Sequence, residues 1–169
     1  MRRGQDGRQC LDFADPLQRR ALRGSPDDSA AYYLAKADAA VSNGRTNVGR
    51  AYSDSARVVL ERRLELRPDD LRDNGSLGLA YAGLGRFDDA KRTGERAVEL
   101  SAGVITASFT GPTLARIYVL TGDYDAAIDR LEQVLSVPSI ISVPLLRFDP
   151  LWDPLRDHPR FQRLLLAEQ

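Results

Sequence analysis

Apolar residues recur at helical spacing in two segments of the chain that align with each other without a gap. Residues 77–100 read LGLAYAGLGRFDDAKRTGERAVEL, and residues 114–137 read LARIYVLTGDYDAAIDRLEQVLSV. Equivalent positions are 37 residues apart and hold identical or similar side chains: Leu77 and Leu114, Tyr81 and Tyr118, Gly85 and Gly122, Phe87 and Tyr124, Asp88 and Asp125, Ala90 and Ala127. A constant offset over several pairs predicts an internal structural repeat.

Each segment divides at a glycine into two amphipathic helices. Apolar residues keep a period near 3.6 on both sides of Gly85 and of Gly122. Glycine suits the left-handed residue that ends a helix, and a short link then turns the next helix back antiparallel. Each segment is therefore predicted to be a helix hairpin. Small residues on the second helix predict a close approach of its neighbours: Ala90, Gly94 and Ala97.

A further hairpin is predicted upstream, at residues 29–67. Ser42-Asn43-Gly44 ends its first helix, and Pro68 closes a longer second helix. Asp69-Asp70 then stands where the next helix is capped. The remaining repeats are predicted at residues 70–101 and 110–137.

The segments around the repeats are predicted to be irregular. Residues 101–112 are expected to form a loop because they contain Gly103, Gly111 and Pro112, and this loop would lengthen the repeat beyond the usual spacing of about 34 residues. Residues 1–12 are expected to be disordered, and residues 13–28 to form a short helix and a linker.

The last segment, residues 138–169, is predicted to be a C-terminal cap. Four prolines allow only short helical turns before a last short helix that contains Phe161: Pro144, Pro150, Pro154 and Pro159. The last repeat of a stack exposes one apolar face, which needs a cover. Leu151, Trp152, Leu155 and Phe161 are suited to cover that face.

The two aligned segments resemble the tetratricopeptide repeat. The positions that carry the resemblance are Leu77, Gly78, Tyr81, Gly85, Ala90 and Ala97, and Leu114, Ala115, Tyr118, Gly122 and Ala127. Asn74 and Gly111 depart from it, because the repeat prefers tryptophan there. The resemblance implies an all-α fold, a tetratricopeptide-like α-solenoid of about three helix hairpins with a proline-rich C-terminal capping tail. It also implies a non-catalytic scaffold that binds a protein or peptide.

A narrower resemblance is carried by residues 93–100, 115–119 and 142–161. These stretches look like the C-terminal repeat region of large bacterial signalling proteins, in which a serine/threonine kinase domain or a winged-helix domain precedes the repeats. The resemblance implies an alternative role as a regulatory or sensor segment, within a longer chain or in trans. Kinase activity is not implied, because the glycine-rich loop and the catalytic-loop motif of kinases are absent from the sequence.

Composition and charge exclude several other functions. Lysine plus arginine equals aspartate plus glutamate at 24 each, so the net charge is zero and no broad field favours nucleic acid. No apolar run approaches the roughly 20 residues that span a bilayer, and the first residues lack the apolar core of a secretory signal. We therefore predict a cytoplasmic protein without membrane contact, or an extracytoplasmic one if it normally follows a membrane span.

Candidate catalytic and metal-binding residues are few. His158 and Cys10 are the single histidine and the single cysteine, whereas a zinc site needs several converging ligands. Asp88-Asp89 and Asp125 stand at predicted helix starts, where carboxylates complement the helix dipole. The sequence thus predicts no metal, no cofactor, no small-molecule substrate and no catalytic residue.

The resemblance also implies where a partner binds. In this repeat class the first helices of successive hairpins line a concave surface. Spacing from Tyr81 and Tyr118 predicts that these residues face it: Tyr32, Lys36, Arg72, Leu79, Ala82, Phe109, Arg116 and Val119. Basic side chains beside apolar ones suit an extended acidic or C-terminal peptide, because arginine can hold a carboxylate through two hydrogen bonds. Plain solvated surface is the competing interpretation.

Overall fold

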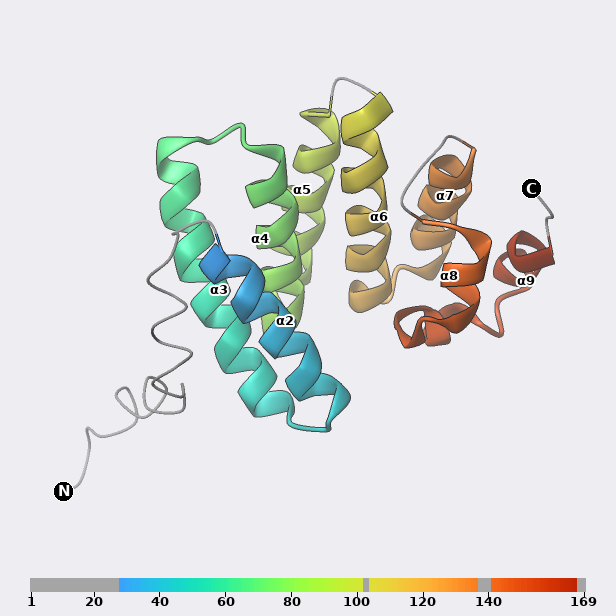
Figure 1. Cartoon of the computed structure of the whole chain (residues 1–169), viewed down its shortest axis with the longest axis horizontal. Coiled ribbons are helices and arrows are strands. Elements are labelled where there is room, and N and C mark those ends of the chain that lie inside the picture. The colour runs from blue at the N-terminus through green and yellow to red at the C-terminus, as the bar shows by residue number, and fades with distance from the viewer. Residues whose placement is uncertain (1–27, 102–103, 137–140, 167–169) are drawn as a thin grey trace.

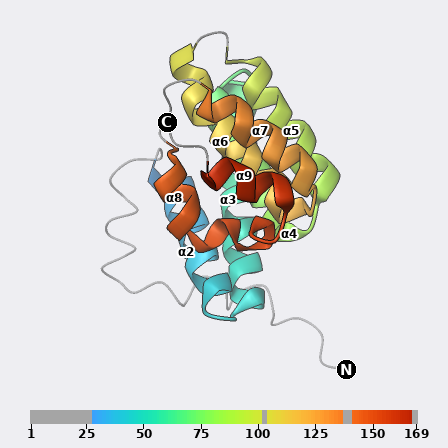
Figure 2. The same ribbon diagram turned by 90° about the vertical axis from the view of Figure 1, so that its right-hand side faces the viewer.

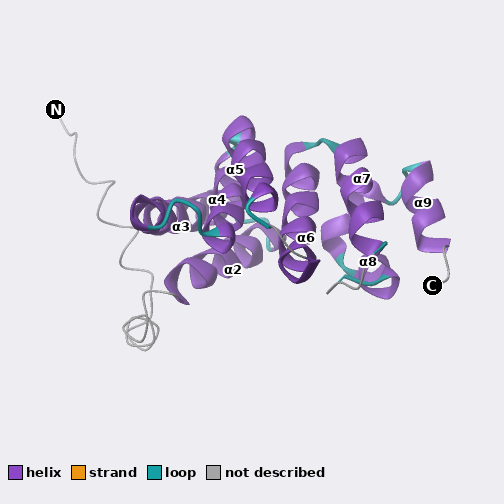
Figure 3. Cartoon of the chain, turned by 90° about the horizontal axis from the view of Figure 1, so that it is seen from above, coloured by secondary structure: helices purple, strands orange, loops and turns teal. Residues whose placement is uncertain are grey.

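Three antiparallel helix hairpins follow one another along the chain in the computed structural model, which describes residues 28–101, 104–136 and 141–166 (Figure 1). The hairpins pair α2 (Asp28–Ser42) with α3 (Thr46–Leu66), α4 (Leu71–Leu84) with α5 (Phe87–Glu99), and α6 (Val104–Thr121) with α7 (Tyr124–Leu135). The tail adds α8 (Val143–Phe148), the 3-10 helix η2 (Pro150–Leu155) and α9 (Pro159–Leu166). Figure 3 shows these described elements as helices joined by short loops. The predicted all-α solenoid of three hairpins is confirmed.

The predictions for residues 1–12, and for residues 13–27 of the predicted linker, lie outside the described residues. The links at 102–103 and 137–140 are likewise outside them.

A glycine with a positive φ angle turns the chain inside each hairpin. The φ angles are 71° at Gly44, 78° at Gly85 and 83° at Gly122, in the left-handed region that glycine adopts without steric cost. After Gly85 and Gly122 the next backbone N–H donates back to a tyrosine carbonyl, Arg86 to Tyr81 and Asp123 to Tyr118, both at 2.9 Å. These glycines therefore act as the predicted helix ends.

Asp70 forms the predicted N-terminal cap of α4. The Asp70 carboxylate accepts hydrogen bonds from the backbone N–H groups of Arg72 and Asp73, both at 3.0 Å. These two donors belong to the first helical turn and have no partner within the helix. Asp70 therefore fixes where α4 begins.

The predicted loop at residues 101–112 is wrong, because α6 already begins at Val104 and contains Pro112. Gly111 is needed for packing and not for a turn: a Cβ atom there would lie 2.5 Å from Cγ2 of Val134 on α7. Proline removes one hydrogen bond from a helix interior. The buried contact of α6 with α7 outweighs this local cost, and the link after α5 is correspondingly short.

Small residues bring α4, α5 and α6 into close contact. A Cβ atom added to Gly78 would lie 3.0 Å from the Ala90 carbonyl oxygen and 2.6 Å from Cδ1 of Ile117. A Cβ atom added to Gly94 would also lie 2.6 Å from Cδ1 of Ile117, whose side chain is fully buried. Ile117 thus fills a niche whose walls exist only because positions 78 and 94 lack side chains.

The two repeat tyrosines link each hairpin to the one before it. Tyr81 on α4 donates a hydrogen bond of 2.9 Å to Glu61 on α3, and Tyr118 on α6 donates one of 2.9 Å to Glu95 on α5. Burial, together with the hydrogen bond to Glu95, raises the pKa of Tyr118 from 10.0 to about 12. The same bond therefore recurs at both interfaces between hairpins.

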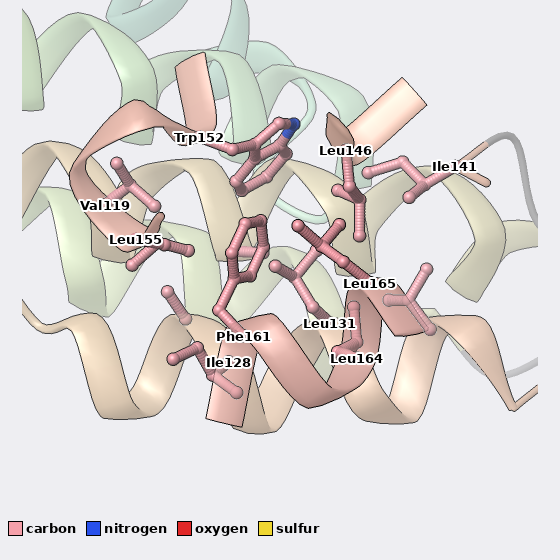
Figure 4. Close-up of a cluster of buried hydrophobic side chains, with 13 residues drawn as sticks. Val119, Ile128, Leu131, Ile141, Leu146, Trp152, Leu155, Phe161, Leu164 and Leu165 are labelled. Carbon is pink, nitrogen blue, oxygen red and sulfur yellow. The ribbon is translucent and has the colours of Figure 1, made fainter. Parts of the chain in front are cut away.

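The tail packs on the last hairpin as the predicted cap. Trp152, Leu155 and Phe161 are at most 2 % exposed and lie against apolar residues of α7, including Ile128 and Leu131 (Figure 4). Figure 2 shows α8 and α9 gathered at this end of the molecule. Ion pairs join the rim of the cap to α7: Arg160 lies 2.5 Å from Asp129 and 2.9 Å from Glu132.

We expect the Gly78→Val variant to lose about 1–3 kcal/mol of unfolding free energy, because its side chain would overpack the α4–α5 contact. Urea denaturation followed by circular dichroism measures this loss. Ala39→Val, at an exposed position of α2, is the control and should change the free energy little. Equal midpoints for wild type and Gly78→Val would contradict the close-contact interpretation.

We expect the stability to fall at alkaline pH through the Tyr118 hydroxyl. The folded-state pKa of Tyr118 is raised to about 12. The contribution of its protonated hydroxyl to the free energy of unfolding is therefore fully present below pH 10 and is lost as the pH rises through about 12. Absorbance titration of tyrosine ionisation and urea midpoints across this range measure the effect. Tyr118→Phe should lack one late-ionising tyrosine; an unchanged titration curve would contradict the assignment.

Candidate functional site

The exposed and half-buried residues on one face of α4 and on one face of α6 make up a surface that we call the α4–α6 strip. Positions three or four apart share one face of a helix. On α4 this face holds Arg72, Ser76 and Leu79, and on α6 it holds Phe109, Thr113, Arg116 and Leu120. Each α6 position is the 37-residue equivalent of an α4 position, so the repeat sets the two faces side by side. In Figure 1, α6 lies between the first two hairpins and α8.

One end of the strip joins Arg72 to Phe109. The guanidinium carbon of Arg72 lies 5.8 Å from the centre of the Phe109 ring, and this ring is 45 % exposed. A cation over an aromatic face is held by the ring quadrupole. The structure therefore brings together two of the predicted partner-binding residues, from two different hairpins.

The middle of the strip is occupied by Arg116. Its Nη2 atom lies 2.5 Å from Oδ2 of Asp38, which belongs to α2. The Arg116 side chain is 28 % exposed, and its Nε atom is buried without a hydrogen-bond partner among the described residues. Arg116 thus presents its terminal nitrogens, and not Nε, to the outside.

Tyr32 and Lys36 lie elsewhere. Lys36 Nζ is 5.5 Å from the Tyr32 ring centre, and Tyr32 packs edge-on against Tyr33, which stacks on Tyr52 of α3. At about 100° per residue, Lys36 is rotated about 160° around α2 from Asp38. Because Asp38 pairs with Arg116 of α6, this rotation turns Lys36, and with it the Tyr32 ring that it contacts, away from the strip.

Three other predicted residues contribute mainly to the core. Val119 is 6 % exposed and packs in the cluster that the C-terminal cap completes, and Ala82 is 7 % exposed. Leu79 is half-buried against the cluster formed by the first two hairpins. Of these three, only Leu79 offers some surface to a partner.

Sequence reasoning missed Leu120 and Asp38. Leu120 is 41 % exposed and lies one helical turn after Arg116, so the spacing along α6 could have identified it. Asp38 lies 78 residues before Arg116 in the sequence and belongs to another hairpin. Nothing in the local pattern around Asp38 indicates this contact.

The strip offers cationic and apolar groups in alternation. Phe109 and Leu120 are separated by 11 positions of α6, which corresponds to about 16 Å along the helix axis. Arg116 lies between them, and Arg72 lies beside Phe109. Such a surface can hold carboxylates by charge-assisted hydrogen bonds and apolar side chains by contact.

Other potential sites on the described residues are weaker. Residues 28–101, 104–136 and 141–166 contain no group of three or more His, Cys, Asp or Glu side chains placed to hold a metal ion. None of the helices in these ranges has the length and apolar character needed to cross a bilayer. A shallow hollow beside the cap includes Arg160, but Asp129 and Glu132 already engage that arginine.

Comparison with known proteins identifies the repeats. Residues 74–103 and 113–139 match the tetratricopeptide repeat family. The matched segments contain most of the second and third hairpins, including Leu79, Arg116 and Leu120 of the strip, and they confirm the tetratricopeptide resemblance of these residues. No curated protein matches the chain. The narrower resemblance to bacterial signalling proteins stays a prediction.

Proposed function

From the premise that the second and third hairpins are tetratricopeptide repeats, we propose that this protein is a non-catalytic interaction module. Repeats of this family generally mediate contacts between proteins, through surfaces built by successive helix pairs. The occupant that we propose for the α4–α6 strip is an extended acidic peptide of a partner protein. Its acidic side chains would meet Arg72 and Arg116, and its apolar side chains would meet Phe109 and Leu120.

The observation that carries this proposal is the pairing of Arg72 with Phe109 across two hairpins. An exposed aromatic ring that holds a guanidinium group presents an apolar surface and a positive charge at the same point. Arginine and aromatic residues are also the side chains most enriched at the energetically dominant positions of protein interfaces. The strip therefore has the side chains expected of a peptide-binding surface.

The length and charge of the strip suit a short peptide segment. An extended chain advances about 3.3 Å per residue, so about five residues cover the distance from Phe109 to Leu120. The chain as a whole has no net charge, so the attraction to an acidic peptide is local to the two arginines. The same balance gives no general attraction for the phosphate backbone of nucleic acids.

An alternative proposal is a regulatory or sensor segment of a bacterial signalling kinase or transcription regulator. The observation that favours it is the folded tail: residues 142–161, which carry the narrower resemblance, form α8, η2 and the start of α9 and complete the cap. Sequencing the DNA upstream of the Met1 codon tests it. An in-frame kinase or winged-helix domain would support the alternative, and the strip would then be the docking surface of that larger protein.

We expect Arg116→Glu to weaken the binding of an acidic peptide about tenfold or more, because an attractive charge becomes a repulsive one. The probe is a fluorescein-labelled eight-residue peptide in which pairs of Asp or Glu alternate with pairs of Leu or Phe, so that each face of the extended chain presents both acidic and apolar side chains. Fluorescence anisotropy gives the Kd. A second peptide, with Asn and Gln in place of the acids, should bind weakly to both proteins.

Arg92→Glu is the matched control for this prediction. Arg92 is 75 % exposed on α5, outside the strip, and its replacement changes the net charge by the same amount. It should leave the Kd nearly unchanged. Wild-type binding by Arg116→Glu, or an equal loss in both variants, would reject the strip as the binding surface.

A further inference from the structure

The carboxylate of Asp38 lies at the position that a partner's carboxylate would take on Arg116. Its Oδ2 atom is 2.5 Å from Nη2 of Arg116, and the two groups form an ion pair. Asp38 comes from α2 in the first hairpin, whereas Arg116 comes from α6 in the third. Figure 1 shows α2 crossing in front of α4.

We propose that Asp38 is an internal competitor of the acidic ligand and lowers the affinity of the α4–α6 strip for carboxylates. This inference rests on the proposed function, because it takes Arg116 as a ligand contact. In the free protein Arg116 is engaged by Asp38. A ligand carboxylate must replace Asp38 before it can use the terminal nitrogens of Arg116.

The exposure of the two side chains supports exchange over a permanent structural role. The Asp38 side chain is 52 % exposed, so its carboxylate can rotate into water without any movement of α2. Ion pairs at such exposed positions contribute little to stability, because each partner is well solvated alone. The buried side chains of α2 are instead the small residues on its other side, Ala30, Ala37 and Ala40.

Competition of this kind acts on those ligands that bind through Arg116. A neutral amide peptide cannot replace a carboxylate on Arg116 at equal strength, because its hydrogen bonds lack the charge. Asp38 therefore lowers the affinity of acidic ligands more than that of neutral ones, because a neutral ligand gains little from Arg116 with or without Asp38. A ligand that presents both carboxylate oxygens to the guanidinium group would overcome the competition most readily.

Arg72, the second arginine of the strip, provides an internal comparison. Within the described residues it lies over the Phe109 ring, and no carboxylate oxygen is within ion-pair distance of it. Its terminal nitrogens need not leave an acidic side chain before they bind a ligand. The two arginines of the strip thus differ in how readily they can bind a ligand carboxylate, because Arg116 is already paired with Asp38.

The test measures binding of the acidic eight-residue probe to Asp38→Asn. We expect binding roughly threefold to fivefold tighter than wild type, because the competitor is removed and the side-chain volume is kept. The amide version of the probe should gain less. Asp38→Ser is a second variant, and thermal denaturation of both shows whether the fold is retained.

Asp153→Asn is the matched control. Asp153 is 57 % exposed and forms a 2.6 Å ion pair with Arg156 in the tail, so the variant loses a similar pair and the same charge. Its affinity for the probe should equal that of wild type. Equal tightening in Asp38→Asn and Asp153→Asn would overturn the proposal, because a general charge effect would then explain both.

A double-mutant cycle with Arg116→Gln completes the test. In the Arg116→Gln background, Asp38→Asn should no longer tighten binding. If wild type binds the acidic probe and Asp38→Asn binds equally or more weakly, the competition is refuted and the proposed function stands. If neither wild type nor any variant binds the probe, the proposed function fails, and the competition fails with it.

Discussion

The close contact of α4, α5 and α6 around Ile117 is the constraint on which the arrangement of the hairpins depends. Gly78 and Gly94 leave a niche that this fully buried side chain fills, and the Ala90 carbonyl oxygen lies 3.0 Å from the position of a Cβ atom on residue 78. Interiors of proteins are packed at nearly crystalline density, so the helices have little freedom to separate or slide. The positions of α4 and α6, and with them the strip, follow from this contact.

The repeat supplies the geometry of the strip, and divergence between the repeats supplies its chemistry. Equivalent positions on α4 and α6 carry Arg72 and Phe109, Leu79 and Arg116, and Gly83 and Leu120. Because side chains at equivalent positions differ, a cationic group on one helix lies beside an apolar group on the other, as Arg72 lies beside Phe109. Two identical repeats would have placed identical side chains next to each other, and the contact between Arg72 and the Phe109 ring would not exist.

The sequence predicted the features that repeat and missed those that depend on single long-range contacts. Gly85 and Gly122 located the helix ends, because few residues other than glycine adopt positive φ angles there. Gly111 and Pro112 led to the wrong prediction of a loop at residues 101–112. Their local preference for turns is weaker than the packing of α6 on α7. Val119 was assigned to the partner surface, but the cap buries it, and no local pattern around Val119 shows where a tail will pack. Asp38 could not be predicted, since its partner is in another hairpin.

The ion pair between Asp38 and Arg116 has a consequence for how this array melts. Repeat arrays usually behave as one-dimensional systems in which each unit senses its immediate neighbours alone. Here the tyrosine–glutamate bonds join adjacent units, but Asp38 reaches past the second unit to the third. The first and third hairpins are therefore coupled directly as well as through the second one, but this direct coupling is weak, because an exposed ion pair contributes little to stability.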